Sequence, residues 1–146
     1  YLRYGQVVLV RADETAITSI DALKAGGKTV AVQLGTTNDE TATKLMGDKN
    51  VKRFDTFDLA VQALINKDAD AVLIDQPSAL GYMPTNKGKL KIVGQPFTDE
   101  VLGFAFKKGD TATKAAFDAA LVQLQKNGTL DKLYQKWLVD FVPDNP

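Results

Sequence analysis

The residues with the clearest chemical potential are Gly35, Thr36 and Thr37, which follow the apolar and β-branched run at residues 29–34. The polar Asn38 comes next, so the pattern predicts a buried strand, a tight turn and the start of a helix. A helix N-terminus presents unpaired N–H groups and partial positive charge, which suit a carboxylate. Gly35 has no Cβ and lets a ligand approach the backbone closely. Either threonine could instead be only the N-cap of the helix.

Asp75 is the second candidate, because it ends the uninterrupted apolar run at residues 71–74. Such a run is typical of a central parallel strand that is buried on both faces. Ligands of open α/β sheets bind at the carboxyl ends of the strands, where an aspartate can pair with an ammonium group. The alternative is a cap, since Gln76 and Pro77 form a competent helix start.

Gln33 is the third candidate, as a polar side chain within the apolar strand that leads to the Gly35 turn. A buried amide needs hydrogen-bond partners, which can come from the protein or from a ligand. If Gln33 points out of the end of the sheet, it could contact a polar ligand. If it points sideways, it is a structural amide.

The composition excludes several classes of function. The 146 residues contain no Cys and no His, which removes disulfides, thiolate nucleophiles, histidine bases, and zinc sites built on Cys or His. Lys and Arg total 18 and Asp and Glu total 18, so nothing favours binding to nucleic acid or anionic membrane. We expect no metal and no cofactor. The chain starts at Tyr1 without a signal peptide, which we interpret as a processed or excised segment.

Hydrophobic periodicity predicts an alternation of strands and helices. Strands are expected at residues 6–11, 29–34, 51–54, 71–74, 90–93 and 101–106. Helices are expected at residues 20–24, 38–46, 57–65, 77–82, 111–126 and 129–138, with a loose tail at 142–146. This alternation predicts an α/β fold with a mostly parallel open sheet flanked by helices.

Five segments in this order resemble one known family. They are YLRYGQVVLVR, LKAGGKTVAVQLGTTNDE, DADAVLIDQPSAL, GFAFKKGD and NGTLDKLYQKW. The combination is similar to the polar amino-acid-binding family of ABC-transporter solute-binding proteins, which have the type II periplasmic binding protein fold. The resemblance implies two α/β lobes that are joined by two crossover strands and close on a polar or basic amino acid of the arginine or glutamine type.

The resemblance also implies roles for single residues. Gly35, Thr36 and Thr37 would bind the α-carboxylate of the amino acid, and Asp75 would pair with its α-ammonium group. Two further residues, Gln33 and Asn38, match positions that line the far side of the ligand. The partners implied are a free amino acid and an ABC permease in the membrane. The location implied is periplasmic or extracellular, with a lipoprotein anchor as an option.

The sequence departs from the family in one respect, because most of the first lobe would lie before the YLRYGQ segment. We therefore expect residues 1–12 to be a crossover strand with a first-lobe remnant, and residues 13–94 to be the second lobe. Residues 95–100 would be the second crossover. Residues 101–146 would be a strand and helices that normally pack on the first lobe. The chain would then carry about half of a binding site.

The C-terminal helices carry apolar stripes that this arrangement leaves without their usual partner. The residues concerned are Phe117, Leu121, Leu124, Leu133, Tyr134 and Trp137. Each large apolar side chain left in water costs roughly 1.5–3 kcal/mol relative to burial. We therefore expect these helices to find a surface, either on the second lobe, on a second copy by dimerisation or swapping, or on the missing fragment.

Three other functions remain as alternatives. A dehydratase or similar lyase could use Glu100 or Glu40 as a desolvated general acid, although the lack of His disfavours it. A receiver-like signalling domain could use Asp75 as a phosphoacceptor, but no acidic pair lies near the first strand to hold Mg²⁺. A structural fragment that binds nothing is the third.

Overall fold

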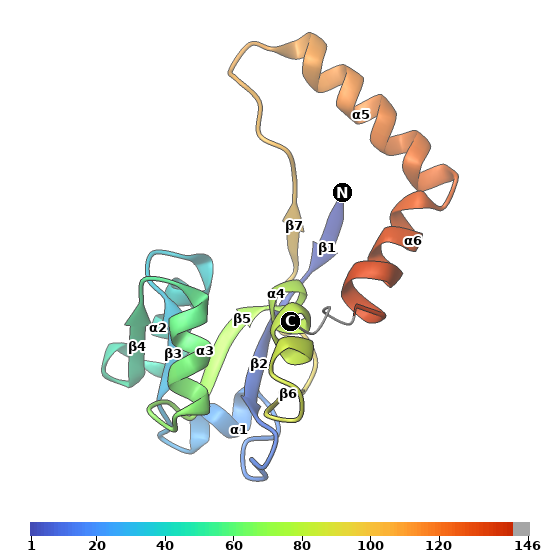
Figure 1. Cartoon of the computed structure of the whole chain (residues 1–146). Coiled ribbons are helices and arrows are strands. Elements are labelled where there is room, and N and C mark those ends of the chain that lie inside the picture. Colours follow the sequence, from blue (N-terminus) through green and yellow to red (C-terminus); the bar gives the residue numbers. More distant parts are fainter. Residues whose placement is uncertain (142–146) are drawn as a thin grey trace.

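The centre of the structure, a computed structural model, is a five-stranded sheet with the strand order β4-β3-β5-β2-β6 (Figure 1). Its strands are β2 (Gln6–Arg11), β3 (Val30–Gln33), β4 (Val51–Phe54), β5 (Ala71–Asp75) and β6 (Leu90–Val93). The structure describes residues 1–141, so the tail expected at residues 142–146 lies outside the described residues.

The α/β class expected from the sequence is confirmed, and the sheet is mixed. Strand β3 pairs parallel with β4 and β5, whereas β2 pairs antiparallel with both β5 and β6. The segment Gln6–Arg11, which we expected to be a crossover strand, lies inside the sheet, and its role as a crossover stays a prediction. The five residues before Arg11 are all buried, so both faces of the strand are covered.

Helices cover both faces of the sheet. They are α1 (Ile20–Ala25), α2 (Thr37–Met46), α3 (Phe57–Ile65) and α4 (Gln76–Thr85), with a 3-10 turn η1 (Asp48–Asn50) after α2. Side chains alternate along β2, so Val7 and Leu9 pack with the α3 and α4 residues, while Val8 and Val10 pack with α1 and α2. Two apolar cores result, and they fix the carboxyl ends of β3 and β5 at one edge.

A two-stranded antiparallel ribbon projects from this sheet and consists of β1 (Leu2–Tyr4) and β7 (Glu100–Leu102). Gly5 joins β1 to β2, and a Cβ at Gly5 would lie 2.3 Å from the carbonyl oxygen of Thr98. Only glycine fits this close crossing of the two chain segments. The strand expected at residues 101–106 is wrong beyond Leu102, because β1 starts at Leu2 and offers no partner further along.

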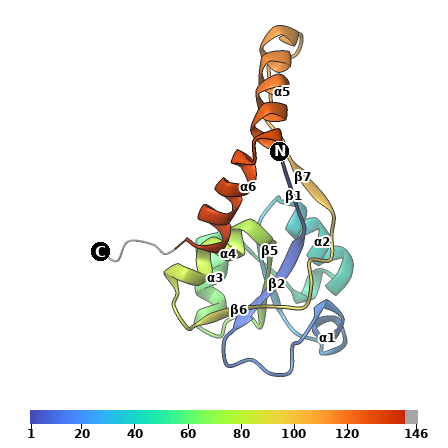
Figure 2. The ribbon, with the colours of Figure 1, turned by 90° about the vertical axis from the view of Figure 1, so that its right-hand side faces the viewer.

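The chain then leads into an arm of helices that first projects away from the sheet and then returns toward α4 (Figure 2). The arm contains α5 (Thr111–Lys126), α6 (Thr129–Tyr134) and a π-helical turn η2 (Gln135–Val139). No residue of α5 or α6 is buried, and Trp137 is 51% exposed. Within residues 1–141, no helix is long and apolar enough to cross a membrane.

Candidate functional site

Thr36 and Thr37, at the start of α2, have different roles. Thr36 is the N-cap: its hydroxyl accepts a hydrogen bond from the N–H of Asp39 at 3.3 Å and donates to the Gln33 carbonyl at 2.8 Å. Thr37 is the first helical residue, and its hydroxyl is not needed for capping. The N–H groups of Thr37 and Asn38 have no acceptor within the helix, because they belong to its first turn. The capping interpretation therefore applies to Thr36.

Gly35 adopts φ 73°, a left-handed conformation that favours glycine. No atom lies within 4 Å of the place where a Cβ would be, so the turn faces open space. The N–H of Gly35 donates to Oδ2 of Asp39 at 3.1 Å. Asp39 is buried and also pairs with Arg53 through an Nε to Oδ1 distance of 2.8 Å. Asp39 and its ion pair with Arg53 hold the backbone of the turn in place. They do not occupy the N–H groups of Thr37 and Asn38 at the start of α2.

Asp75 is the last residue of β5 and lies at the N-cap position of α4, but its carboxylate makes no capping hydrogen bond. Instead, Oδ1 of Asp75 accepts from Nδ2 of Asn38 at 3.0 Å. That bond joins the end of β5 to the first turn of α2. The structure thus brings Thr37, Asn38 and Asp75 to the same edge of the sheet.

Three further polar residues lie at this edge. Gln6 and Tyr4 were not predicted as site residues, and Glu100 was named only as the possible acid of a lyase. Nε2 of Gln6 donates to Oε1 of Glu100 at 2.8 Å and, more weakly, to Oγ1 of Thr37 at 3.5 Å. Oγ1 of Thr37 also donates to Oε2 of Glu100 at 3.5 Å. The third residue is Tyr4, which lies opposite Glu100 in the β1–β7 register. The ribbon and the sheet therefore meet at the candidate site.

The charges at this edge favour a bound cation beside the carboxylates of Asp75 and Glu100, next to the anion site at the N-terminus of α2. Burial raises the pKa of the Tyr4 phenol, and the charges of Asp75 and Glu100 raise it further. The phenol therefore stays protonated. Among the described residues, neither Asp75 nor Glu100 forms an ion pair with a Lys or Arg side chain. The edge thus offers unpaired carboxylate charge next to the N-terminus of α2.

Gln33 does not join this group. Its Nε2 donates to the backbone carbonyl of Asp55 at 3.1 Å, on the side of β4. This is the sideways orientation that makes Gln33 a structural amide. The sequence contained one signal for the missed residues: Gln6 is a polar residue directly before the apolar run at residues 7–10. In the structure Gln6 is 1% exposed. Glu100 and Tyr4 gave no such signal, because their position depends on the pairing of β1 with β7.

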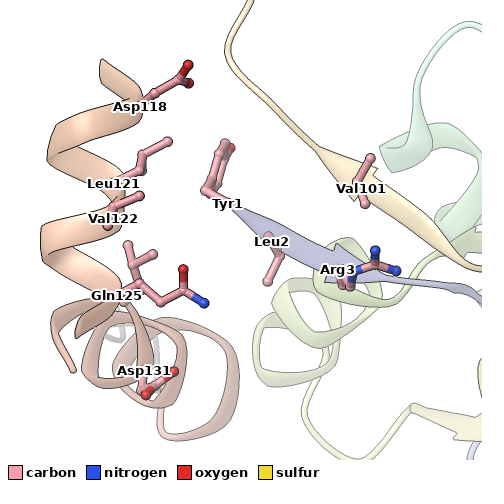
Figure 3. Close-up of a pocket in the computed structure, with 10 residues that line it drawn as sticks. Tyr1, Leu2, Arg3, Val101, Asp118, Leu121, Val122, Gln125 and Asp131 are labelled. Atoms are coloured by element: carbon pink, nitrogen blue, oxygen red, sulfur yellow. The ribbon is translucent and has the colours of Figure 1, made fainter. Parts of the chain in front are cut away.

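A separate cavity of about 580 Å³ lies between the ribbon and the helical arm (Figure 3). Its lining includes Tyr1, Leu2 and Val101 from the ribbon, and Leu121 and Val122 from α5. Figure 3 shows these side chains facing one another across an open space. The walls also carry the polar side chains of Arg3, Asp118, Gln125 and Asp131.

Residues 1–140 match the family described as bacterial extracellular solute-binding proteins, family 3, and the chain belongs to this family. The resemblance noted from the sequence is therefore confirmed.

Two curated relatives are similar over 94% of this chain. One is the ABC transporter glutamine-binding protein GlnH of Bacillus subtilis (strain 168), at 32% identity, and the other is a probable histidine-binding protein of Neisseria gonorrhoeae, at 36% identity. The chain spans about half the length of these relatives, 50% and 52% respectively. A solved structure described as an ancestral arginine-binding protein bound to glutamine matches 94% of the chain at 38% identity, with a TM-score of 0.79, and is itself covered to 60%.

Proposed function

We propose that this chain is one lobe of an amino-acid receptor that serves an ABC importer, and that its ligand is a polar or basic amino acid. Thr37 and the free N–H groups of α2 bind the ligand carboxylate, with Gly35 and the Thr36 cap shaping the turn. Asp75 accepts the ligand ammonium group, and Asn38 holds Asp75 in place. Gln33 lines the proposed site, and its amide bonds to the protein and not to the ligand.

One observation carries this proposal. The Nδ2 of Asn38 joins the first turn of α2 to Asp75 at 3.0 Å, so an anion site and an unpaired carboxylate lie side by side. A free amino acid has a carboxylate and an ammonium group on the same carbon and matches both. The names of the similar proteins, which bind glutamine, histidine and arginine, support the same class of ligand.

The share of the relatives' length that this chain spans suggests how the receptor is divided. Because the chain spans about half of its curated relatives, we propose that residues 13–94, together with strand β2, form the second lobe. Residues 1–5 and 95–102 are the connections, and the arm after them packs on the first lobe or on a second copy. The receptor works outside the cytoplasmic membrane, in the periplasm or at the cell surface, and passes the amino acid to a membrane permease.

We propose no catalysis for this chain. Glu100, the candidate acid of a lyase, accepts hydrogen bonds from Gln6, Thr98 and Thr37, so the fold already uses this side chain at the junction of ribbon and sheet. Turnover of prephenate-like substrates that disappears in Glu100→Gln would contradict this.

Isothermal titration with a panel of amino acids tests the proposal. This chain should bind polar or basic amino acids weakly, and a longer chain that includes the first lobe should bind them far more tightly. The reason is that a lobe alone contacts only one side of the ligand. If the longer chain shows no heat with any amino acid, the proposed function is wrong.

A further inference from the structure

Glu100 lies where the ribbon meets the sheet, and its carboxylate contacts the carboxylate-binding side of the proposed site. Oε1 accepts from Nε2 of Gln6 at 2.8 Å and from Oγ1 of Thr98 at 2.9 Å. The first bond sets the orientation of the Gln6 amide, because only the NH₂ group can face a carboxylate. Gln6 is 1% exposed, so its amide has little freedom to turn.

The oriented amide in turn faces the Thr37 hydroxyl. Nε2 of Gln6 lies 3.5 Å from Oγ1 of Thr37 and approaches it as a donor. A hydroxyl that accepts from one side keeps its own hydrogen for another partner. Oε2 of Glu100, also at 3.5 Å, is an equally weak acceptor for that hydrogen. The Thr37 hydroxyl can therefore exchange this contact for a ligand carboxylate.

Gln6 also links Glu100 to the strand pair that carries Asp75. Gln6 lies opposite Asp75 in the β2–β5 register, and its amide donates to Glu100 at 2.8 Å. The carboxylate of Glu100 is therefore joined to the end of the sheet where Asp75 and Thr37 lie.

We propose that Glu100 is a positioning residue of the amino-acid site, an inference that rests on the proposed function. It does not touch the ligand. Through Gln6, whose amide it orients, it leaves the Thr37 hydroxyl to donate to the ligand carboxylate. Because Glu100 belongs to β7, the ribbon that joins the lobes is tied to the carboxylate end of the site.

A double-mutant cycle on residues 1–146 tests the proposal, with L-arginine titrated and amide NMR shifts as the readout. Thr37→Val and Glu100→Ala should each weaken binding by about tenfold, the size expected for loss of a hydrogen bond to a charged group. Independent effects would multiply to a roughly hundredfold loss of affinity in the double variant. Because Glu100 acts partly through Thr37, we expect the double variant to lose much less affinity than that. Glu100→Gln keeps an acceptor oxygen for Gln6 and should recover most of the affinity.

Asp99→Ala is the matched control. It removes a carboxylate from the neighbouring position, where an exposed ion pair with Arg3 at 3.2 Å also joins the two ribbon segments. Exposed ion pairs contribute little, so the affinity should change by less than about twofold. If Glu100→Ala does not fold, Gln6→Met carries the same test, because it removes the amide between Glu100 and Thr37.

The outcomes separate the two claims. Unchanged affinity in Glu100→Ala or Gln6→Met, an equal loss in Asp99→Ala, no recovery in Glu100→Gln, or an additive cycle overturns the role of Glu100. In each of these cases the proposed function stands, because the wild-type chain still binds. A wild-type chain that responds to neither L-arginine nor L-glutamine overturns the proposed function, and the role of Glu100 with it.

Discussion

At the scale of single residues, the adjacent Thr36 and Thr37 differ in how the fold uses their hydroxyl groups. The Thr36 hydroxyl is used by the fold, since it caps α2 and bonds to the Gln33 carbonyl. The Thr37 hydroxyl has only weak partners at 3.5 Å. The two residues are therefore a natural pair for separating stability from binding.

Thr36→Val should lower the free energy of unfolding by about 1 kcal/mol, because the N-cap oxygen is lost. Thr37→Val should change that free energy by less than about 0.5 kcal/mol while weakening amino-acid binding. Chemical denaturation and ligand titration of both variants provide the measurement. Equal losses of stability in the two variants would show that Thr37 is structural.

At the scale of elements, the sequence predicted most of the helices and strands of the lobe, but not the pairing of β1 with β7 in the ribbon. The strands at residues 51–54 and 90–93 and the helix at 57–65 were found with the predicted bounds, because their apolar spacing is regular and local. The antiparallel direction of β2 and the end of β7 at Leu102 depend on pairing between distant segments. The same is true of Tyr4 and Glu100, which no local pattern could place beside Asp75.

Gly5→Ala should destabilise the junction of ribbon and sheet. The new Cβ would lie 2.3 Å from the Thr98 carbonyl oxygen, a backbone atom that cannot turn away. Overpacking of this kind costs about 1–3 kcal/mol, which denaturant unfolding measures. Gly81→Ala is the control: Gly81 lies inside α4 with no atom within 4 Å, so this change should be neutral or stabilising. Equal effects of the two changes would contradict the account.

The contact between α3 and α4 should make stability depend on pH in the alkaline range. Burial, together with a 2.9 Å hydrogen bond to Asp58 and its charge, raises the pKa of Tyr82 to about 12. The folded state therefore keeps this proton while the unfolded state loses it near pH 10. The contribution is fully present below about pH 10 and is lost as the pH rises toward about 12.

Tyr82→Phe removes this titration, so its free energy of unfolding should fall less steeply than that of the wild type between about pH 10 and 12. Urea unfolding at a series of pH values measures both slopes. Identical slopes in the two proteins would show that Tyr82 does not contribute to the alkaline loss of stability.

At the scale of the whole molecule, the lobe is covered on both faces and the arm is not. Several aromatic side chains of the arm contact one another, with the rings of Phe104 and Phe117 5.5 Å apart, yet both are at least 43% exposed. The expectation that the arm finds a surface stays a prediction, and the main described contact of the arm with the lobe is that of η2 with α4. The arm is the natural place for a first lobe or a second copy to bind.

The chain should therefore associate as its concentration rises, which sedimentation velocity measures. Trp137 is the single tryptophan and is 51% exposed, so its emission should move to shorter wavelength as the arm becomes covered. A monomer at every concentration, with the emission of a tryptophan in water, would show that the arm stays open.

The most direct test of the central claim is an amide NMR titration of the whole chain with L-arginine. The claim is that one amino acid bridges the start of α2 and the end of β5. The amides of Thr37 and Asn38 and that of Asp75 should shift together, with a single dissociation constant. Shifts confined to the cavity between ribbon and arm, or different constants at the two ends of the site, would contradict it.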